Sequence, residues 1–107
     1  TENDPMLLHL SAKALCCLSK DFAKEMLESN ATIKTSIYLI SLKDDIEMQR
    51  LGGRILVNLL THEKRKAAAF RKYVAKNMIP LVEATDDDCN EMAILLLCSL
   101  SSYEDKS

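Results

Sequence analysis

An all-α fold is predicted by three features of the 107-residue sequence. Apolar residues make up 48% of the chain, while Gly and Pro occur only twice each, which disfavours both disorder and a turn-rich β-protein. The helix formers Leu, Ala, Lys, Glu and Met dominate the stretches between these few breakers. One apolar pattern with helical spacing also recurs along the chain, and each copy predicts a long amphipathic helix.

The recurring pattern consists of five apolar positions spaced by three, four, one and three residues, which trace one stripe of a helix. Three segments of the chain carry this pattern. The number of residues from Leu15 to Leu56 equals the number from Leu56 to Leu97, and we call this separation the repeat length. Its positions are Leu7, Leu10, Ala14, Leu15 and Leu18, then Met48, Leu51, Ile55, Leu56 and Leu59, and finally Cys89, Met92, Leu96, Leu97 and Leu100. Because the phase is kept at a single offset, the pattern indicates a stack of helical repeats with a shared core.

The stretches between these segments correspond as well. Three aliphatic positions are matched one repeat length later: Ile33, Ile37 and Ile40 by Val74, Met78 and Leu81. Each repeat is therefore expected to hold one or two shorter helices before its long one. The predicted helices are 5–19, 22–29, 32–42, 45–60, 63–76, 78–84 and 88–102. A break between the shorter helices of the first full repeat fits either at Asn30 or near Ser36.

Acidic turns precede all three long helices: Asn3-Asp4-Pro5, Lys43-Asp44-Asp45 and Thr85-Asp86-Asp87-Asp88. Aspartate side chains at such turns accept hydrogen bonds from free N–H groups and favour the positive end of the helix dipole. Pro5 is acceptable in a first turn. We therefore expect the long helices to begin at these turns.

The helices resemble those of the armadillo repeat family. The third helix of such a repeat reads roughly Ala-x-Ala-Leu-x-Asn-Leu-Ser after an acidic turn, and Ala12–Ser19 and Gly53–Leu59 are similar to it. Asn77–Val82 looks like the family's Gly-x-Ile-Pro-x-Leu-Val run at the start of the second helix, and Asp45–Gln49 looks like its Asp-x-Glu-x-Gln turn. HEAT repeats and a plain helical bundle are the alternatives.

The resemblance covers nearly the whole chain, taken as a single domain 1–107. It implies a partial leading repeat (1–19), two repeats (20–60 and 61–102) and a tail (103–107). It further implies a right-handed α-α superhelix of about two and a third repeats, with the third helices lining a concave surface. Such a surface binds an extended peptide or a partner domain.

On that concave surface, the partner-binding candidates are Lys13, Gln49, Arg50, Arg54, Asn58 and Ser99. In the nuclear-import receptors of the family, an asparagine ladder holds the peptide backbone, with tryptophans one turn earlier. Here Asn58 stands at a ladder position, whereas Cys17 and Ser99 occupy the other two. The tryptophan positions hold Lys13, Arg54 and Leu95. Binding of nuclear-localisation signals is therefore not expected.

A basic stretch is the largest charge feature, and within residues 61–80 only Glu63 opposes it. It comprises Lys64, Arg65, Lys66, Arg71, Lys72 and Lys76. This stretch is either a docking face for an acidic partner or the solvated outer face of a helix. Nucleic acid is not expected as a partner, because the net charge is −2 and the aromatic residues are few and scattered.

Motifs for catalysis, metal binding and cofactor binding are missing from the sequence. There is no Cys-x-x-Cys, and the spacing of Cys89 and Cys98 is too long for the usual zinc motif. Gly52-Gly53 lies within a predicted helix, where it implies a close helix crossing or a bend and not a phosphate-binding loop. We therefore expect no enzyme activity, metal or cofactor.

The four cysteines sit among apolar residues and are expected to be buried, inert thiols. This use of cysteine predicts a reducing, intracellular location, the cytoplasm. No apolar run approaches the roughly 20 residues that span a bilayer, and no secretory signal pattern is present. A membrane partner is therefore not expected.

The predicted function is a non-catalytic protein-interaction scaffold that binds an extended peptide or a partner domain on its concave face. The alternative is a structural assembly segment that stacks on further repeats or self-associates. The chain opens on a lone third helix without an evident polar cap, and stable repeat stacks normally carry such caps. We expect the chain to belong to a longer array or to form a homodimer through that uncapped apolar face.

Overall fold

The computed structural model describes residues 4–104 as an arrangement of helices without a strand. Its elements in order are α1 (Pro5–Leu18), α2 (Ala23–Met26), α3 (Ala31–Ile40), α4 (Ile46–His62), α5 (Lys64–Ala67), the 3₁₀ helix η1 (Ala68–Phe70), α6 (Arg71–Asn77), α7 (Ile79–Glu83) and α8 (Asp87–Glu104). The prediction of an all-α fold is confirmed. Part of the predicted tail, residues 105–107, lies outside the described residues.

Two details of the predicted helix map are decided by the structure. The break between the two shorter helices before α4 falls at Asn30, whereas Ser36 lies buried inside α3 with its hydroxyl donating to the Thr32 carbonyl at 2.9 Å. The single helix predicted over 63–76 is wrong, because the chain divides there into α5, η1 and α6. The second break falls at Phe70, where φ and ψ are −103° and 5° and the ring packs against the core.

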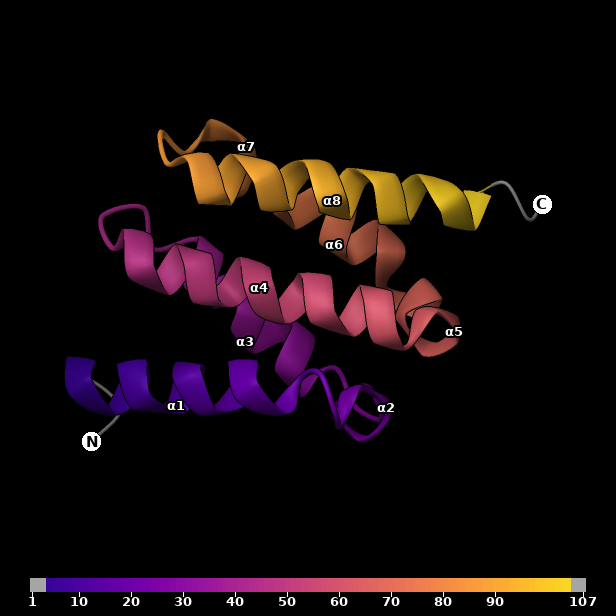
Figure 1. The fold of residues 1–107 in the computed structure, drawn as a ribbon, viewed down its shortest axis with the longest axis horizontal. Helices are drawn as coiled ribbons and strands as arrows, with labels where there is room; N and C mark the ends of the chain where they lie inside the picture. The colour runs from indigo at the N-terminus through magenta and orange to yellow at the C-terminus, as the bar shows by residue number, and fades with distance from the viewer. Residues whose placement is uncertain (1–3, 105–107) are drawn as a thin grey trace.

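The three long helices α1, α4 and α8 lie side by side and run in the same direction, with the shorter α3 and α6 behind them (Figure 1). Parallel neighbours require a return path for the chain. The segment α2–α3 supplies it between α1 and α4, and α5–α7 supply it between α4 and α8. The molecule is consequently a flattened body with extents of 44 × 30 × 19 Å.

One aspartate caps each long helix, and the three are spaced by the repeat length. The Asp4 carboxylate accepts from the Met6 amide at 3.0 Å, the Asp45 carboxylate from the Met48 amide at 3.2 Å, and the Asp86 carboxylate from the Cys89 amide at 3.1 Å. Each bond satisfies an N–H group that has no partner within its own helix. The prediction that the acidic turns start the long helices is confirmed.

The core is centred on α4, which contacts α1, α3 and α8. The predicted stripe of this helix is largely buried, and its fully buried side chains Ile55, Leu56 and Leu59 pack with residues of α3, α6, α7 and α8. Burying one such side chain contributes roughly 1.5–3 kcal/mol relative to leaving it exposed. The packing of this central helix therefore accounts for much of the apolar burial in the chain.

The corresponding stripe of α1 is not buried, contrary to the prediction of one shared core stripe. Leu7, Leu10 and Leu18 are exposed, because the described chain supplies α1 with no counterpart of α3. This helix instead contacts α4 through a neighbouring side that includes the buried Ala12 and Ser19. The first repeat segment therefore contributes few large side chains to the core.

The glycine pair of α4 permits close contacts on two sides. A Cβ on Gly52 would stand 2.8 Å from the Leu39 Cβ and 2.8 Å from the Ser36 carbonyl oxygen, both in α3. A Cβ on Gly53 would stand 2.9 Å from the terminal methyl of Met92 in α8. The close helix crossing predicted from this pair is thus confirmed at α3.

Candidate functional site

The outward side of α1, α4 and α8 carries the candidate binding residues. Side chains one repeat length apart occupy corresponding positions on these parallel helices, in a row of His9, Arg50 and Glu91 and a row of Lys13, Arg54 and Leu95. We call these two rows the long-helix face. All of its side chains are exposed except that of His9, which is half-buried. Of the six predicted binding residues, Lys13, Arg50 and Arg54 lie on this face.

Gln49 is not on the surface, contrary to the prediction. Its side chain is 2% exposed, and its amide nitrogen donates to the Ile40 carbonyl at 2.8 Å. That carbonyl belongs to the last turn of α3, which has no intrahelical donor for it. Gln49 therefore joins α4 to the end of α3 and is not available to a partner.

Asn58, at the ladder position of the armadillo pattern, is also inside the protein. The side chain is 7% exposed, and its amide nitrogen donates to the Ser19 hydroxyl oxygen at 2.8 Å. The same hydroxyl donates to the Cys16 carbonyl at 2.7 Å. This chain of bonds joins α1 to α4, so the expectation that Asn58 is an exposed binding residue is wrong. Ser99, its counterpart on α8, is half-buried.

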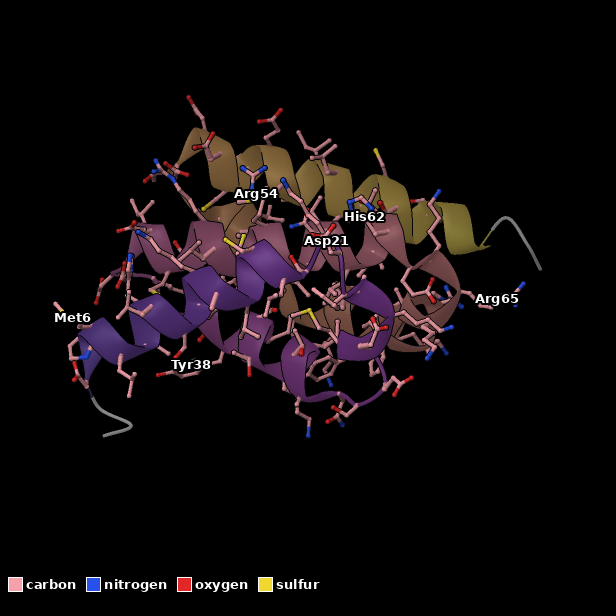
Figure 2. The ribbon with its side chains drawn as sticks, turned by 60° about the horizontal axis from the view of Figure 1, so that its bottom comes forward. Met6, Asp21, Tyr38, Arg54, His62 and Arg65 are labelled. Atoms are coloured by element: carbon pink, nitrogen blue, oxygen red, sulfur yellow. The ribbon has the colours of Figure 1, made fainter. Side chains whose placement is uncertain are left out.

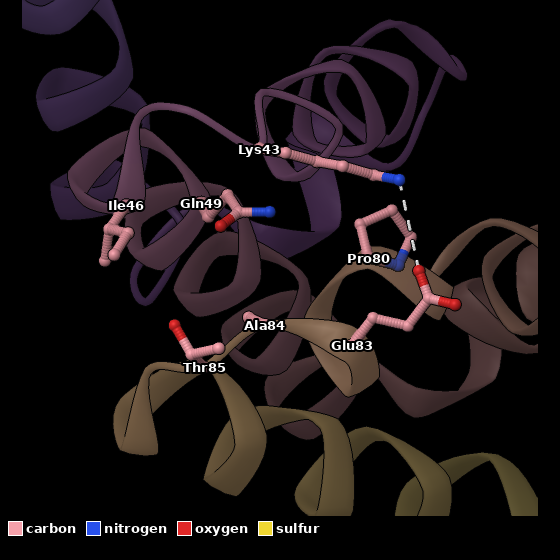
Figure 3. A pocket seen from close by; sticks show the side chains of 7 residues that line it. All are labelled: Lys43, Ile46, Gln49, Pro80, Glu83, Ala84 and Thr85. Atoms are coloured by element: carbon pink, nitrogen blue, oxygen red, sulfur yellow. Dashed lines mark ion pairs between the residues drawn. The ribbon is translucent and has the colours of Figure 1, made fainter.

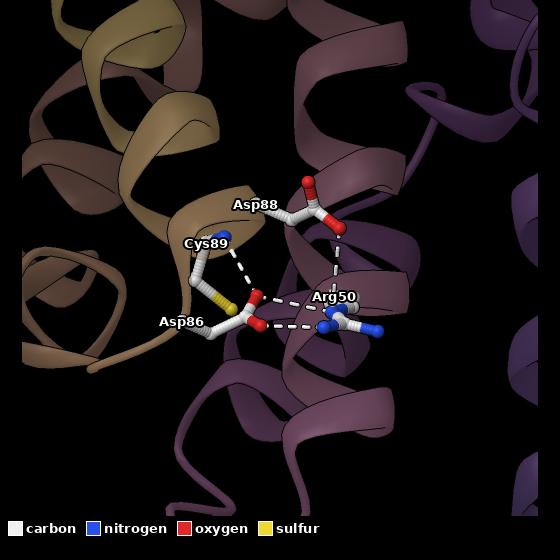
Figure 4. Close-up of polar contacts among 4 residues, drawn as sticks. All are labelled: Arg50, Asp86, Asp88 and Cys89. Atoms are coloured by element: carbon white, nitrogen blue, oxygen red, sulfur yellow. Dashed lines mark hydrogen bonds and ion pairs between the residues drawn. The ribbon is translucent and has the colours of Figure 1, made fainter.

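Arg50 is tied to the start of α8 by two carboxylates (Figure 4). Its Nε donates to Asp86 at 3.0 Å, a second guanidinium nitrogen donates to the other oxygen of Asp86, and Asp88 lies at 3.5 Å. A bidentate pair of this kind fixes the orientation of both groups. The hydrogen bonds from Arg50 hold the pKa of Asp86 well below its usual range, and the Cys89 amide contributes in the same direction.

A second polar contact joins α1 to α4 at the corresponding place. His9 Nε2 lies 3.4 Å from a Glu47 carboxylate oxygen, and each of these residues precedes its counterpart in the Arg50–Asp88 pair by one repeat length. Both junctions between long helices are therefore bridged by a contact between a side-chain nitrogen of one helix and a carboxylate of the next. Local spacing rules do not reveal either pair, since the partners are far apart in sequence.

Acidification is expected to weaken the protein through Asp86. Because the pKa of this carboxylate is lower in the folded chain, its contribution to stability is complete above the unfolded-state pKa of about 3.9 and is lost as the pH falls toward the folded-state pKa. The urea midpoint should fall less between pH 7 and pH 3 in Asp86→Asn than in the wild type. An equal fall would contradict this role, and Asp44→Asn is the exposed acidic control.

All four cysteines lie in the described part of the chain and are free thiols. Cys89 is buried and Cys16 half-buried, but Cys17 and Cys98 are exposed, contrary to the expectation that all four lie in the core. Burial raises the pKa of Cys16, and burial together with the Asp86 carboxylate raises the pKa of Cys89 to about 11. Both of these thiols are therefore protonated, and poor nucleophiles, at neutral pH.

The basic stretch is divided by the break at Phe70 between α5 and α6. Lys66 pairs with Glu28 at 3.3 Å, and Arg71 is half-buried. The exposed members are Lys64, Arg65, Lys72 and Lys76. Arg65 lies at the opposite end of the molecule from Met6 (Figure 2). The predicted docking face is therefore shorter than the six residues of the sequence pattern.

A cleft of about 170 Å³ lies between the start of α4 and the α7–α8 turn (Figure 3). It is lined by Lys43, Ile46, Gln49, Pro80, Glu83, Ala84 and Thr85. Lys43 and Glu83 stand 4.0 Å apart at its edge, and both are largely exposed.

Residues 4–104 contain no group of three or more His, Cys, Asp or Glu side chains placed to hold a metal ion. None of the helices in this part of the chain combines the length and the apolar character that crossing a membrane requires.

Comparisons of the chain with protein-family models, with curated proteins and with solved structures find no match.

Proposed function

We propose that this protein is a non-catalytic, armadillo-like interaction scaffold whose long-helix face binds an extended acidic segment of a partner protein. The observation that supports this most is the placement of Lys13 and Arg54. Both side chains are exposed, they hold corresponding positions on neighbouring parallel helices, and neither forms an ion pair with a described residue. The row ends with the exposed apolar Leu95 on α8.

The spacing of this row defines the segment that fits it. Packed helices lie roughly 8–10 Å apart, and an extended polyproline-type chain brings every third side chain to the same side at intervals of about 9 Å. A partner with acidic side chains at positions i and i+3 and an apolar one at i+6 would therefore meet Lys13, Arg54 and Leu95 in turn. Glu91 lies on the same helix as Leu95, in the neighbouring row, and its carboxylate disfavours acidic residues of the partner after position i+6.

Polar contacts beside this row hold the helices in register. Arg50 is engaged by Asp86 and Asp88, and Asn58 by Ser19. A binding row whose spacing is fixed before the partner arrives loses less entropy on association. The free thiols of the chain suit a reducing compartment, which supports the cytoplasm as the proposed site of action.

Charge reversal at Arg54 is expected to weaken this interaction. The measurement is fluorescence anisotropy with a labelled Glu-x-x-Glu-x-x-Leu peptide held extended by prolines. Each exposed ion pair contributes roughly 0.2–1 kcal/mol, so Arg54→Glu, which also introduces repulsion, should weaken binding by about tenfold, and added salt should weaken wild-type binding.

Lys34→Glu is the matched control, because Lys34 is an exposed lysine on α3 and does not belong to the long-helix face. This variant should bind like the wild type. Unchanged affinity in Arg54→Glu, or an equal loss in Lys34→Glu, would show that the acidic segment does not use the long-helix face.

A further inference from the structure

Large apolar side chains are exposed at both ends of the row of long helices. At the outer side of α1, Met6 and Leu10 are 71% and 56% exposed, and we call these two residues the leading face. At the outer side of α8, Ile94 and Leu97 are 60% and 49% exposed, and we call them the trailing face. Figure 1 shows that α1 and α8 border the row, with α4 between them.

The trailing face corresponds to one half of an interface that the chain already contains. Ile94 and Leu97 follow Gly53 and Leu56 of α4 by one repeat length. Both of these α4 residues are buried, and Gly53 approaches Met92 of α8 and Leu81 of α7. The trailing face therefore repeats, on α8, the side that α4 turns toward its following helix.

The leading face corresponds to the other half of the same interface. Met92, which approaches Gly53 from α8, is matched by Leu51 on α4 and by Leu10 on α1 at successive steps of the repeat length. Met92 is buried, Leu51 is half-buried and Leu10 is exposed. The leading face thus presents the side that a long helix turns toward the helix before it.

We propose that a second copy of this chain stacks head to tail on the first, with the leading face of one copy against the trailing face of the other. A second copy fits these faces because its α1 would pack against α8 in the way that α4 packs against α1 and α8 packs against α4 within one chain. The two faces are different surfaces, so the contact is heterologous and can add further copies in a line. Ala12, Gly53 and Ile94 hold corresponding positions on α1, α4 and α8. Ile94 is the largest of the three, so it adds apolar area to the contact.

The test uses one variant of each face, Leu10→Glu and Leu97→Glu, analysed by sedimentation velocity from about 1 to several hundred micromolar, the range of weak association. The wild type should increase in mean mass with concentration beyond that of a dimer. Each variant alone should remain monomeric. An equimolar mixture should form a dimer and nothing larger, because each variant retains the face that the other has lost.

Leu95→Glu is the matched control, because Leu95 is 47% exposed on the same helix as Leu97 but belongs to the long-helix face. It should assemble like the wild type. Met6→Glu and Ile94→Glu repeat the test if circular dichroism shows that a first variant is unfolded. A wild type that stays monomeric, a Leu97→Glu variant that dimerises alone, or a mixture that stays monomeric would overturn the proposal. Peptide binding is not involved in any of these outcomes.

Discussion

Leu56→Ala is expected to lower the free energy of unfolding by about 2–5 kcal/mol. The Leu56 side chain is fully buried in α4, the helix that contacts α1, α3 and α8. Truncation removes the transfer free energy of the buried side chain and leaves a cavity that its neighbours refill only in part. Urea denaturation of dilute protein, followed by far-UV circular dichroism, measures the loss directly.

The three long helices supply internal controls, because leucine stands at the corresponding position in each of them. Leu15 is half-buried and Leu97 is half-exposed. Leu15→Ala should cost less than Leu56→Ala, and Leu97→Ala should change the free energy of unfolding by less than about 1 kcal/mol. Similar losses at all three positions would mean that the outer helices are covered as completely as α4, against the burial described above.

Gly52→Ala is expected to lower the free energy of unfolding by about 1–3 kcal/mol. The added Cβ would lie 2.8 Å from a backbone oxygen of α3 and 2.8 Å from a Cβ, so neither obstacle can be relieved by rotating a side chain. Relief requires α3 and α4 to move apart within a packed core. This cost exceeds the gain of about 1 kcal/mol that alanine brings to a helix interior.

Gly53→Ala is the adjacent control, with nearly the opposite expectation. Its nearest obstacle is the terminal methyl of Met92 at 2.9 Å, the far end of a flexible side chain that can adopt another rotamer. The helix-propensity gain should then offset the repacking, leaving the urea midpoint close to that of the wild type or above it. A large loss in Gly53→Ala, or none in Gly52→Ala, would contradict the packing described for α4.

The three long helices and their starting points could be predicted from sequence because both depend on local chemistry. Apolar residues at helical spacing predict a helix and its apolar side. An aspartate before the first turn marks the residue at which the helix begins. Whether that side is covered depends on a distant segment. The α1 stripe therefore satisfies the same pattern as the α4 stripe and yet remains exposed, since α3 packs mainly against α4.

The candidate site was predictable only in part, for a related reason. A polar side chain on a helix is expected at the surface, and this holds for Lys13 and Arg54. Gln49 and Asn58 differ because each meets a polar group of a neighbouring segment, the Ile40 carbonyl and the Ser19 hydroxyl, which makes burial tolerable. The partners of Arg50 belong to the start of α8, a different helix far along the chain, so no helix-pair rule identifies them.

The common direction of the three long helices also has an electrical consequence. Aligned helices add their dipoles, so the edge where they begin is positive and the edge where they end is negative. Acidic Asp4, Asp45 and Asp86 stand at the first edge, and basic Lys64 and Arg65 follow the end of α4. The side chains thus oppose the field of the backbone, so they partly compensate the summed helix dipoles at both edges of the row.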